Sequence, residues 1–293
     1  MENPLRNIHI AYFSGTGGTE VAAMQLAAAF EKKDIHAELS EIRVGALYPS
    51  GTEDALFLLF AVHAFDAPKP VFNWLKELPT GNGKTAVVIS VSGGGEISPN
   101  TACRVGVNQV IENKGWNVFY EKMLVMPCNI AVETKEPLSV KLLEILPEKI
   151  NRIVDDVLSG KRRRTKPLWV DRMMAWVGAL EKRMAPLWGN RIRVHANCVG
   201  CGWCQEHCPT ANIRIENGKA AFSWNCCLCM KCLYGCPHKA LRPGFAKFIV
   251  LKDGFDLKRL EQMVPYSESI DIEAQTKGFL WAGIRDYLLD RDA

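Results

Sequence analysis

Apolar and amphipathic segments alternate along the first half of the chain. Five short apolar segments have the length and the residue types of strands: residues 9–13, 37–42, 55–62, 85–91 and 117–125. Four further segments are typical of helices: residues 20–32, 70–78, 101–113 and 138–158. This alternation predicts a parallel sheet with helices on both faces, and five such strands suit a doubly wound α/β fold with the strand order 2-1-3-4-5.

The second half of the chain has a different pattern. A basic run at residues 161–164 precedes a helical stretch at 168–187 that is rich in Trp and Met, and cysteines then crowd together before a terminal helix expected at 279–289. We therefore expect an α/β domain at 1–160, a helical connector at 161–189, a cysteine-rich domain at 190–245 and an extension at 246–293.

Composition narrows the class of protein. The chain has 293 residues, of which 48% are hydrophobic and 23% charged, as in ordinary globular proteins. A net charge of +4 is too small to indicate nucleic-acid binding. Residues 1–8 lack the apolar core of a secretion signal, and the most apolar run, at 55–62, is too short to cross a bilayer. We expect a cytoplasmic protein whose cysteines are reduced.

Nine of the eleven cysteines lie between Cys198 and Cys236. They form two runs with the spacing C-x2-C-x2-C-x3-C-P, which is the run of bacterial ferredoxins, where the fourth cysteine ligates the other cluster. The sequence therefore predicts two [4Fe–4S] clusters. One is expected to use Cys198, Cys201, Cys204 and Cys236, and the other Cys226, Cys229, Cys232 and Cys208.

The cysteine runs have a weaker alternative interpretation as two zinc sites. Zinc ribbons use paired C-x2-C elements rather than two full quartets that end in Cys-Pro. Cys227 is an extra cysteine beside a ligand, and we expect it not to bind metal. His207 and His238 flank ligands but receive no ligand role, because all eight positions are already filled.

A loop of small residues follows the first expected strand. It consists of Ser14, Gly15, Thr16, Gly17, Gly18 and Thr19, and a helix comes directly after it. Glycines let backbone N–H groups converge on an anion, and hydroxyls add further donors. The loop has no Lys after its last Gly and lacks the G-x-G-x-x-G spacing, so it suits a phosphate monoester held by neutral donors. The alternative is an ordinary glycine-rich turn.

Two more loops should reach the same edge of the sheet, because doubly wound sheets bind ligands beyond the carboxyl ends of their strands. The first follows the third strand and contains Ala61, Val62, His63, Ala64 and Phe65. The second follows the fourth strand and contains Ser92, Gly93, Gly94, Gly95 and Glu96. An ordinary structural histidine is an equal alternative for His63, and core packing is slightly favoured for Phe65.

The whole chain resembles the flavodoxin–ferredoxin fusion proteins of anaerobes. The resemblance rests on residues 12–17, on Pro68-Lys69-Pro70, on Met126-Pro127 and on the two cysteine runs. It implies a flavodoxin-like domain that binds FMN through the three loops, joined to a small α+β ferredoxin-like domain with two [4Fe–4S] clusters. It also implies electron transfer to a redox partner, which it does not identify.

Two other functions stay open at this point. One is an FMN-dependent reductase of a small acceptor such as a quinone, with His63 as a proton donor. The other is a redox sensor whose clusters are structural. No catalytic residue is assigned, and the oligomeric state is not predicted.

The connector also has two interpretations. Packing between the two domains is favoured over binding to a membrane surface, and the basic run would then be free to attract an acidic partner.

Overall fold

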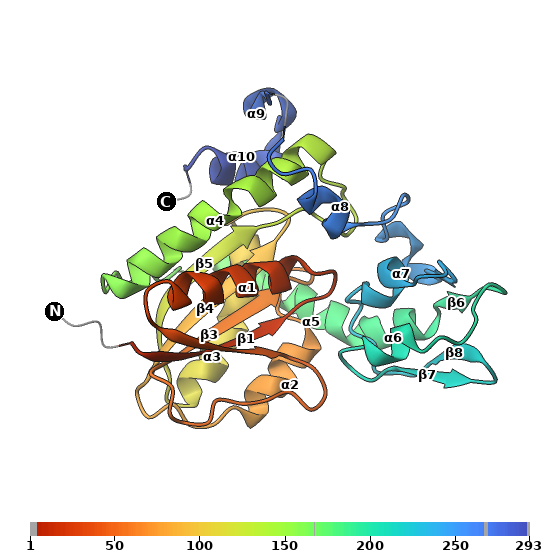
Figure 1. Ribbon diagram of the computed structural model, residues 1–293, viewed down its shortest axis with the longest axis horizontal. Helices are drawn as coiled ribbons and strands as arrows, with labels where there is room; N and C mark the ends of the chain where they lie inside the picture. The colour runs from red at the N-terminus through yellow and green to blue at the C-terminus, as the bar shows by residue number, and fades with distance from the viewer. Residues whose placement is uncertain (1–4, 167, 267–268, 292–293) are drawn as a thin grey trace.

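The computed structural model describes residues 5–166, 168–266 and 269–291 (Figure 1). Its main sheet has five parallel strands in the order β2-β1-β3-β4-β5. The strands are β1 (Asn7–Phe13), β2 (His36–Glu41), β3 (Ala55–Ala61), β4 (Thr85–Ser92) and β5 (Asn117–Val125). The expected fold class, with its strand order, is confirmed.

Helices cover both faces of this sheet. α1 (Gly18–Glu31) and α4 (Glu136–Leu158) pack on one face, and α2 (Lys69–Glu77) and α3 (Val105–Asn113) pack on the other. Because side chains alternate along a strand, β1 contributes Ile8 and Ile10 to the first face but Ala11 and Phe13 to the second. Two buried faces explain why the central strands are apolar runs rather than alternating ones.

One expected helix differs from the structure at its start. Residues 101–113 were expected to form one helix, but the segment begins as a 3₁₀ helix, η1 (Asn100–Arg104), and α3 follows it. The terminal helix expected at 279–289 also starts with a 3₁₀ turn, η3 (Phe279–Trp281), before α10 (Ala282–Leu288). Tight first turns of this kind are common at helix ends and leave little trace in a sequence pattern.

The cysteine-rich segment forms two small antiparallel ladders. β6 (Arg193–Val194) pairs with β9 (Leu241–Arg242), and β7 (Ile213–Glu216) pairs with β8 (Lys219–Phe222). Short helices α6 (Trp203–Glu206) and α7 (Lys231–Gly235) each carry one cysteine, from the first and the second run respectively. This small α+β arrangement is compatible with a ferredoxin-like domain.

The cysteine-rich segment sits beyond the carboxyl ends of β1 and β2, where Figure 1 shows α7 and α6 beside the sheet. The N–H of Val44, just after β2, donates to the carbonyl of Pro209 at 3.0 Å. Lys231 forms an ion pair with Glu41 at 2.8 Å. These contacts hold the cysteines next to the sheet edge where ligands are expected.

Helix α5 (Trp169–Asn190) runs between the two parts and buries one side. Gly178 packs against the loop at Ala64 and Asp66, and Gly189 packs against Cys226. The opposite side keeps an exposed stripe that includes Trp169 (70% exposed) and Trp176 (71% exposed). The expected packing between domains therefore describes one side of the connector only.

The extension adds η2 (Phe245–Phe248), α8 (Leu257–Glu261) and α9 (Ile272–Gln275) before η3 and α10. α8 and α10 contribute to the same apolar core as α1 and α4. Within the described ranges, no helix combines the length and the apolar character that crossing a bilayer requires.

Candidate cofactor sites

A cleft of about 670 Å³ opens at the carboxyl ends of β1, β3, β4 and β5. Of the residues expected to bind a cofactor, the cleft is lined by Ser14, Gly15, Thr16, Gly18, Thr19, Ala61, Val62, His63, Ser92 and Gly93. All three expected loops therefore meet at one site.

The first loop is shaped to present donors to the cleft. Gly17 has φ +102°, a left-handed conformation that favours glycine, and its N–H donates to Ser14 Oγ at 3.2 Å. The first backbone N–H groups of α1 have no partner within the helix, and Gly18 and Thr19 carry two of them at the cleft. This combination of donors and helix dipole favours an anion.

Asn129 supports the same loop from the far side of the cleft. Its amide donates to Thr16 Oγ1 at 2.5 Å, which leaves the hydroxyl proton of Thr16 able to donate elsewhere. Asn129 belongs to the segment after β5, whose members at the cleft are Met126, Pro127, Cys128, Asn129 and Ile130. The sequence patterns did not indicate this segment as part of the site, although β5 also ends at the carboxyl edge of the sheet, where ligands are expected.

The loop after β3 turns sharply at its tip. Ala64 and Phe65 both have positive φ, and the backbones of His63 and Asp66 bond to each other. The turn directs His63 into the cleft, whereas Ala64 and Phe65 lie outside its lining. The His63 ring meets Phe13 edge-on at 6.0 Å. Burial lowers the pKa of His63 to about 4, although a hydrogen bond with the backbone of Cys227 opposes the shift.

The loop after β4 lines the cleft only at its start, and hydrogen bonds to Ser92 hold the rest of the loop in place. Ser92 Oγ accepts hydrogen bonds from the N–H groups of Gly94 and Gly95, both at 3.2 Å. Gly94, Gly95 and Glu96 all lie outside the lining. A side chain at Gly95 would collide with the backbone of Gly283 in α10, so the C-terminal helix packs directly on this loop.

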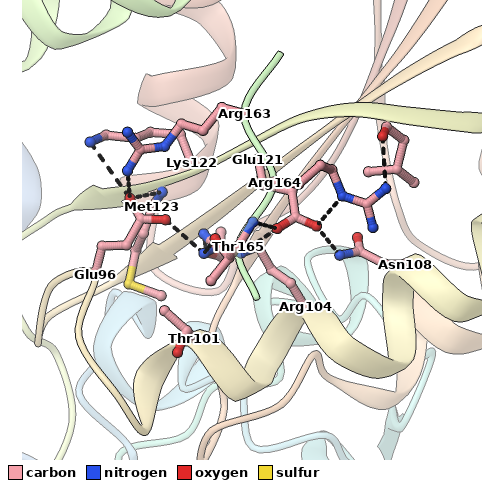
Figure 2. A network of polar contacts seen from close by, with 12 residues as sticks. Glu96, Thr101, Arg104, Asn108, Glu121, Lys122, Met123, Arg163, Arg164 and Thr165 are labelled. Carbon is pink, nitrogen blue, oxygen red and sulfur yellow. Dashed lines mark hydrogen bonds and ion pairs between the residues drawn. The ribbon is translucent and has the colours of Figure 1, made fainter. Parts of the chain in front are cut away.

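Glu96 belongs to a buried ion-pair network, shown in Figure 2. Its carboxylate accepts from Arg104 at 2.6 Å and from the N–H of Met123 at 3.2 Å. Arg104 is only 1% exposed, and Glu121 lies on its other side at 3.9 Å. We therefore assign Glu96 the role of fixing the loop, in place of the contact with the cofactor that the sequence analysis expected.

The basic run at residues 161–164 also contributes ion pairs to this network. Arg163 pairs with Glu96 at 3.3 Å, and Arg164 pairs with Glu121 at 3.2 Å (Figure 2). Lys161 pairs with Asp156 at 3.0 Å. Three of the four cations in this run therefore neutralise carboxylates of the chain itself.

Two further cavities are lined by cysteines, and each one collects one of the two expected quartets. The first, of about 410 Å³, is lined by Cys208, Cys226, Cys229 and Cys232, together with Cys227. We call it the proximal cavity, because Cys229 also lines the cleft. The second, of about 310 Å³, is lined by Cys198, Cys201, Cys204 and Cys236, and we call it the distal cavity.

Electrostatic coupling between the thiols follows the same grouping. Burial, reinforced by Cys229 and Cys208, raises the pKa of Cys226 to about 12. Burial also raises the pKa of Cys204, with further contributions from Cys236 and Cys198. Cys204 in turn contributes to the raised pKa of Cys232, after burial and nearer thiols, so the two cavities are electrostatic neighbours.

The spacing of the sulfur atoms argues against zinc. Within the described ranges, no three cysteine sulfurs lie within 4.8 Å of one another. Four thiolates at about 2.3 Å from one zinc ion would be about 3.8 Å apart. The quartets therefore surround a space too wide for a single ion.

The residues beside the ligands have other partners. Cys227 is buried, and a hydrogen bond between its side chain and that of Cys229 is the main reason why the pKa of Cys229 is lowered. The ring of His207 stacks on Trp203 at 4.3 Å, and its Nδ1 lies 2.8 Å from the Trp203 carbonyl. His238 lines the distal cavity beside Cys236.

One side of the cleft is covered by residues from outside the α/β domain, and the sequence patterns did not indicate this. Phe255 and Leu257 from the extension line it, as do Leu228 and Met230 from the second cysteine run. Tyr234 donates to the carbonyl of Asn129 at 2.8 Å and accepts from the N–H of Leu251 at 2.9 Å. These bonds join the cysteine-rich segment and the extension to the loop after β5.

Comparisons with known proteins add little beyond the fold. No family model matches the chain, and no curated protein matches it. A solved two-electron reduced flavodoxin of Megasphaera elsdenii is 22% identical, with a TM-score of 0.33, and the match covers 40% of this chain and 84% of that one. Flavodoxin 2 of Bacillus cereus is 16% identical, with a TM-score of 0.37, over 51% of this chain and 95% of that one.

A third similar structure is larger than the matched region. It is the rubredoxin oxygen:oxidoreductase of Desulfovibrio gigas, 16% identical with a TM-score of 0.37, and the match covers 55% of this chain and 38% of that one. Similarities at this level carry no argument about what the chain binds, so the function has to be argued from the site itself.

Proposed function

We propose that the chain is an electron-transfer protein that binds FMN in the cleft and one [4Fe–4S] cluster in each cysteine-lined cavity. It would exchange electrons between these cofactors and a redox partner. When bound, FMN supplies exchange of one or two electrons, and the clusters supply single-electron steps.

The observation that carries this proposal is a shared wall, which is a set of three residues that line both the cleft and the proximal cavity. Leu228, Cys229 and Met230 line both the cleft and the proximal cavity. The contact is tight, because a side chain at Gly15 in the phosphate loop would come within 2.3 Å of the Cys229 carbonyl oxygen. A ligand residue of one site thus forms part of the neighbouring site.

The residues at the cleft fit FMN. A phosphate monoester needs several convergent donors, and the loop offers the N–H groups of Gly18 and Thr19 with the hydroxyls of Ser14 and Thr16. No lysine lines the cleft, which suits the neutral-donor phosphate site that the sequence predicts. His63, Ser92 and Gly93 lie at the positions where a ring would be flanked by the second and third loops.

The cysteine cavities fit cubane clusters. Each is lined by one expected quartet, with three cysteines from one run and one from the other, and Cys227 also lines the proximal cavity. Such exchange of the fourth ligand is the pattern of two-cluster ferredoxins. The high pKa of a buried thiol such as Cys226 means that metal binding must displace its proton, which couples cluster binding to folding of this segment.

The remaining residues add apolar side chains to the cleft and hold its loops in place. Phe255 and Leu257 cover its side, and Gly283 packs on the glycine loop after β4. His63, with its pKa lowered to about 4 by burial, is neutral near pH 7 and adds no charge beside the ring position.

The test begins with anaerobic purification of the full chain and analysis of its cofactors. We expect one FMN, about eight iron and about eight sulfide per chain. Stoichiometric reduction should then take up about four electrons per chain, two for the flavin and one for each cluster. Zinc in place of iron, or protein without flavin, would contradict the proposal.

A further inference from the structure

A histidine and two glutamates meet away from the cleft, toward the amino ends of the strands. His9 in β1 lies directly opposite Glu38 in β2 in the sheet register, and Glu53 lies two residues before the start of β3. One donor atom from each of the three residues lies within 4.8 Å of the other two. None of these residues lines the cleft or either cysteine cavity.

His9 is the unusual member of the group. It is 0% exposed, and its Nε2 lies 2.8 Å from Ser40 Oγ. Its Nδ1 is also buried but has no hydrogen-bond partner, and the nearest carboxylate oxygen, Oε2 of Glu38, is 3.5 Å away. Buried polar atoms in folded proteins almost always have a hydrogen-bond partner, so this atom calls for an explanation.

The 3.5 Å separation between Nδ1 and Oε2 suits two ligands of one ion better than a direct ion pair. Charge-assisted N–H···O bonds are about 2.7–2.9 Å long. Ligands at about 2.0–2.2 Å from a tetrahedral zinc ion are about 3.4 Å apart.

Glu53 is held ready to bind a cation. It is 3% exposed, and its carboxylate accepts from Ser50 N at 2.5 Å, from Ser50 Oγ at 2.8 Å and from Gly51 N at 2.9 Å. Burial acts to raise the pKa of Glu53, but these hydrogen bonds outweigh it and the net pKa is lowered. The carboxylate is therefore ionised, and its orientation is fixed by the loop that precedes β3.

Glu38 gives the group a route to solvent. Its side chain is 47% exposed, in contrast to the buried His9 and Glu53. An ion could therefore enter past Glu38 and keep a water molecule on that side. With one imidazole, two carboxylates and no thiol, the donor set suits borderline divalent ions such as Zn²⁺.

We propose that His9 Nδ1, Glu38 and Glu53 form a binding site for a single divalent transition-metal ion. In the tautomer that carries its proton on Nε2, His9 donates to Ser40 Oγ, and the lone pair of Nδ1 is left for the metal, as is common for metal-bound histidines. Burial lowers the pKa of His9, which favours the neutral ring that a metal requires. A bound ion would join β1, β2 and the segment before β3, so its role is structural.

The site is tested on the full chain with its iron–sulfur clusters in place, under anaerobic conditions. Zn²⁺ is titrated in competition with a chromophoric chelator, and the iron content is measured before and after. We expect one zinc ion per chain without loss of iron, and a rise in the melting temperature on binding. Glu38→Gln should weaken zinc binding at least tenfold, and His9→Gln should abolish it.

His36→Gln is the matched control. His36 lies on β2 as Glu38 does, but its exposed ring pairs with a single carboxylate among the described residues, Glu31 at 3.3 Å. This variant should bind zinc as tightly as the unchanged protein. Because Glu38 is half exposed, Glu38→Gln is expected to fold even if the buried His9→Gln does not.

The proposal is overturned if the unchanged chain binds no zinc, or if Glu38→Gln and the unchanged chain bind zinc equally at constant iron content. Zinc bound only as iron is lost would report on the cysteines and would also count against it. The group would then be a buried histidine beside two carboxylates, with no role in metal binding. None of these outcomes depends on FMN or on electron transfer, so this proposal and the proposed function can fail separately.

Discussion

The proximal and distal cavities share one cysteine spacing but have different surroundings. The proximal cavity shares Cys229 with the cleft, and Cys227 beside it is buried in the apolar core under the sheet. The distal cavity lies at the outer end of the segment, where Cys201 is exposed and Val199 is 62% exposed. The ligands alone would make the two clusters equivalent, and only their neighbours distinguish them.

This difference suggests different tasks for two equal motifs. A site that is enclosed between the cleft and the second cavity is suited to internal relay. A site with an exposed ligand is suited to contact with a partner. Cys204 and Cys232 connect the two electrostatically, so the three sites form one continuous series. Variants that change one cavity at a time should therefore have unequal effects.

Replacing one ligand in each cavity should give the largest and most unequal effect. Cys229→Ser and Cys201→Ser should each lower the iron content from about eight to about four per chain. Cys229→Ser should also abolish electron exchange between flavin and the remaining cluster, because it removes the centre between them. Cys201→Ser should leave exchange between the flavin and the proximal cluster intact.

Iron analysis and visible spectra after rapid reduction of the flavin measure both effects. Cys103→Ser serves as the control, since Cys103 is buried under the sheet and lines neither cysteine cavity. Equal loss of exchange in both ligand variants would show that the two cavities do not differ in the way described.

The ion-pair network around Glu96 and Arg104 holds the loop after β4, so its loss should affect the cleft and not the distal cavity. Arg104→Met would remove the buried cation between Glu96 and Glu121, which would keep the less buried Arg163 and Arg164 as partners, and should lower the free energy of unfolding by at most about 3–5 kcal/mol. The glycine loop after β4 would lose its anchor, so FMN should bind more weakly while the distal cluster is retained. Denaturant unfolding and FMN titration measure these effects.

Arg152→Met is the matched control for Arg104→Met. Arg152 is about half exposed and forms ion pairs with Glu148 and Asp290 at the surface. Its replacement should cost about 0–1 kcal/mol. A cost as small as this for Arg104→Met would mean that the network does not hold the loop.

The loop at residues 14–19 contacts the cysteine-rich segment so closely at Gly15 that no side chain should fit there. In Gly15→Ala the new methyl group would lie 2.3 Å from the Cys229 carbonyl oxygen, a backbone atom that cannot rotate away. Overpacking of this kind costs about 1–3 kcal/mol. We expect reduced FMN affinity and a disturbed proximal cluster, seen as a changed EPR signal.

Gly18→Ala tests the same loop without the collision, because its methyl group would meet Met126 at an ordinary 3.6 Å. Its stability and its cluster signals should match those of the unchanged protein. The shared wall would lose its support if both alanine variants behaved alike.

His63 should give the smallest effect, a change in the pH dependence of stability. Burial lowers its pKa to about 4 from a usual value of 6.5, so between these values the unfolded chain binds more protons than the folded one. Stability should therefore fall as the pH is lowered from about 6.5 toward 4. His63→Gln should flatten this slope, as denaturant unfolding at several pH values would show.

The sequence was sufficient for the sheet and for the cysteine quartets because both are carried by local patterns. Alternating apolar segments predict the strand order, and the C-x2-C-x2-C-x3-C-P spacing matches the grouping of Cys208 and Cys236 with the opposite runs. Contacts between distant segments left no such pattern. Nothing local indicates that Phe255 and Leu257 line the cleft, or that Glu96 turns away from it to meet Arg104.

The group at His9 shows the same limit. Only the register between β1 and β2 places Glu38 opposite it, and only the loop before β3 brings Glu53 close. In the sequence the three residues look unrelated, since 29 positions separate His9 from Glu38.

The central claim is that the flavin cleft and the proximal cavity are adjacent parts of one electron path. Flash reduction of the flavin in the anaerobic holoprotein, followed by visible spectra, tests it most directly. Transfer to the clusters within one molecule predicts a rate that does not change with protein concentration. A rate proportional to protein concentration, or a flavin that stays reduced while the clusters stay oxidised, would contradict the claim.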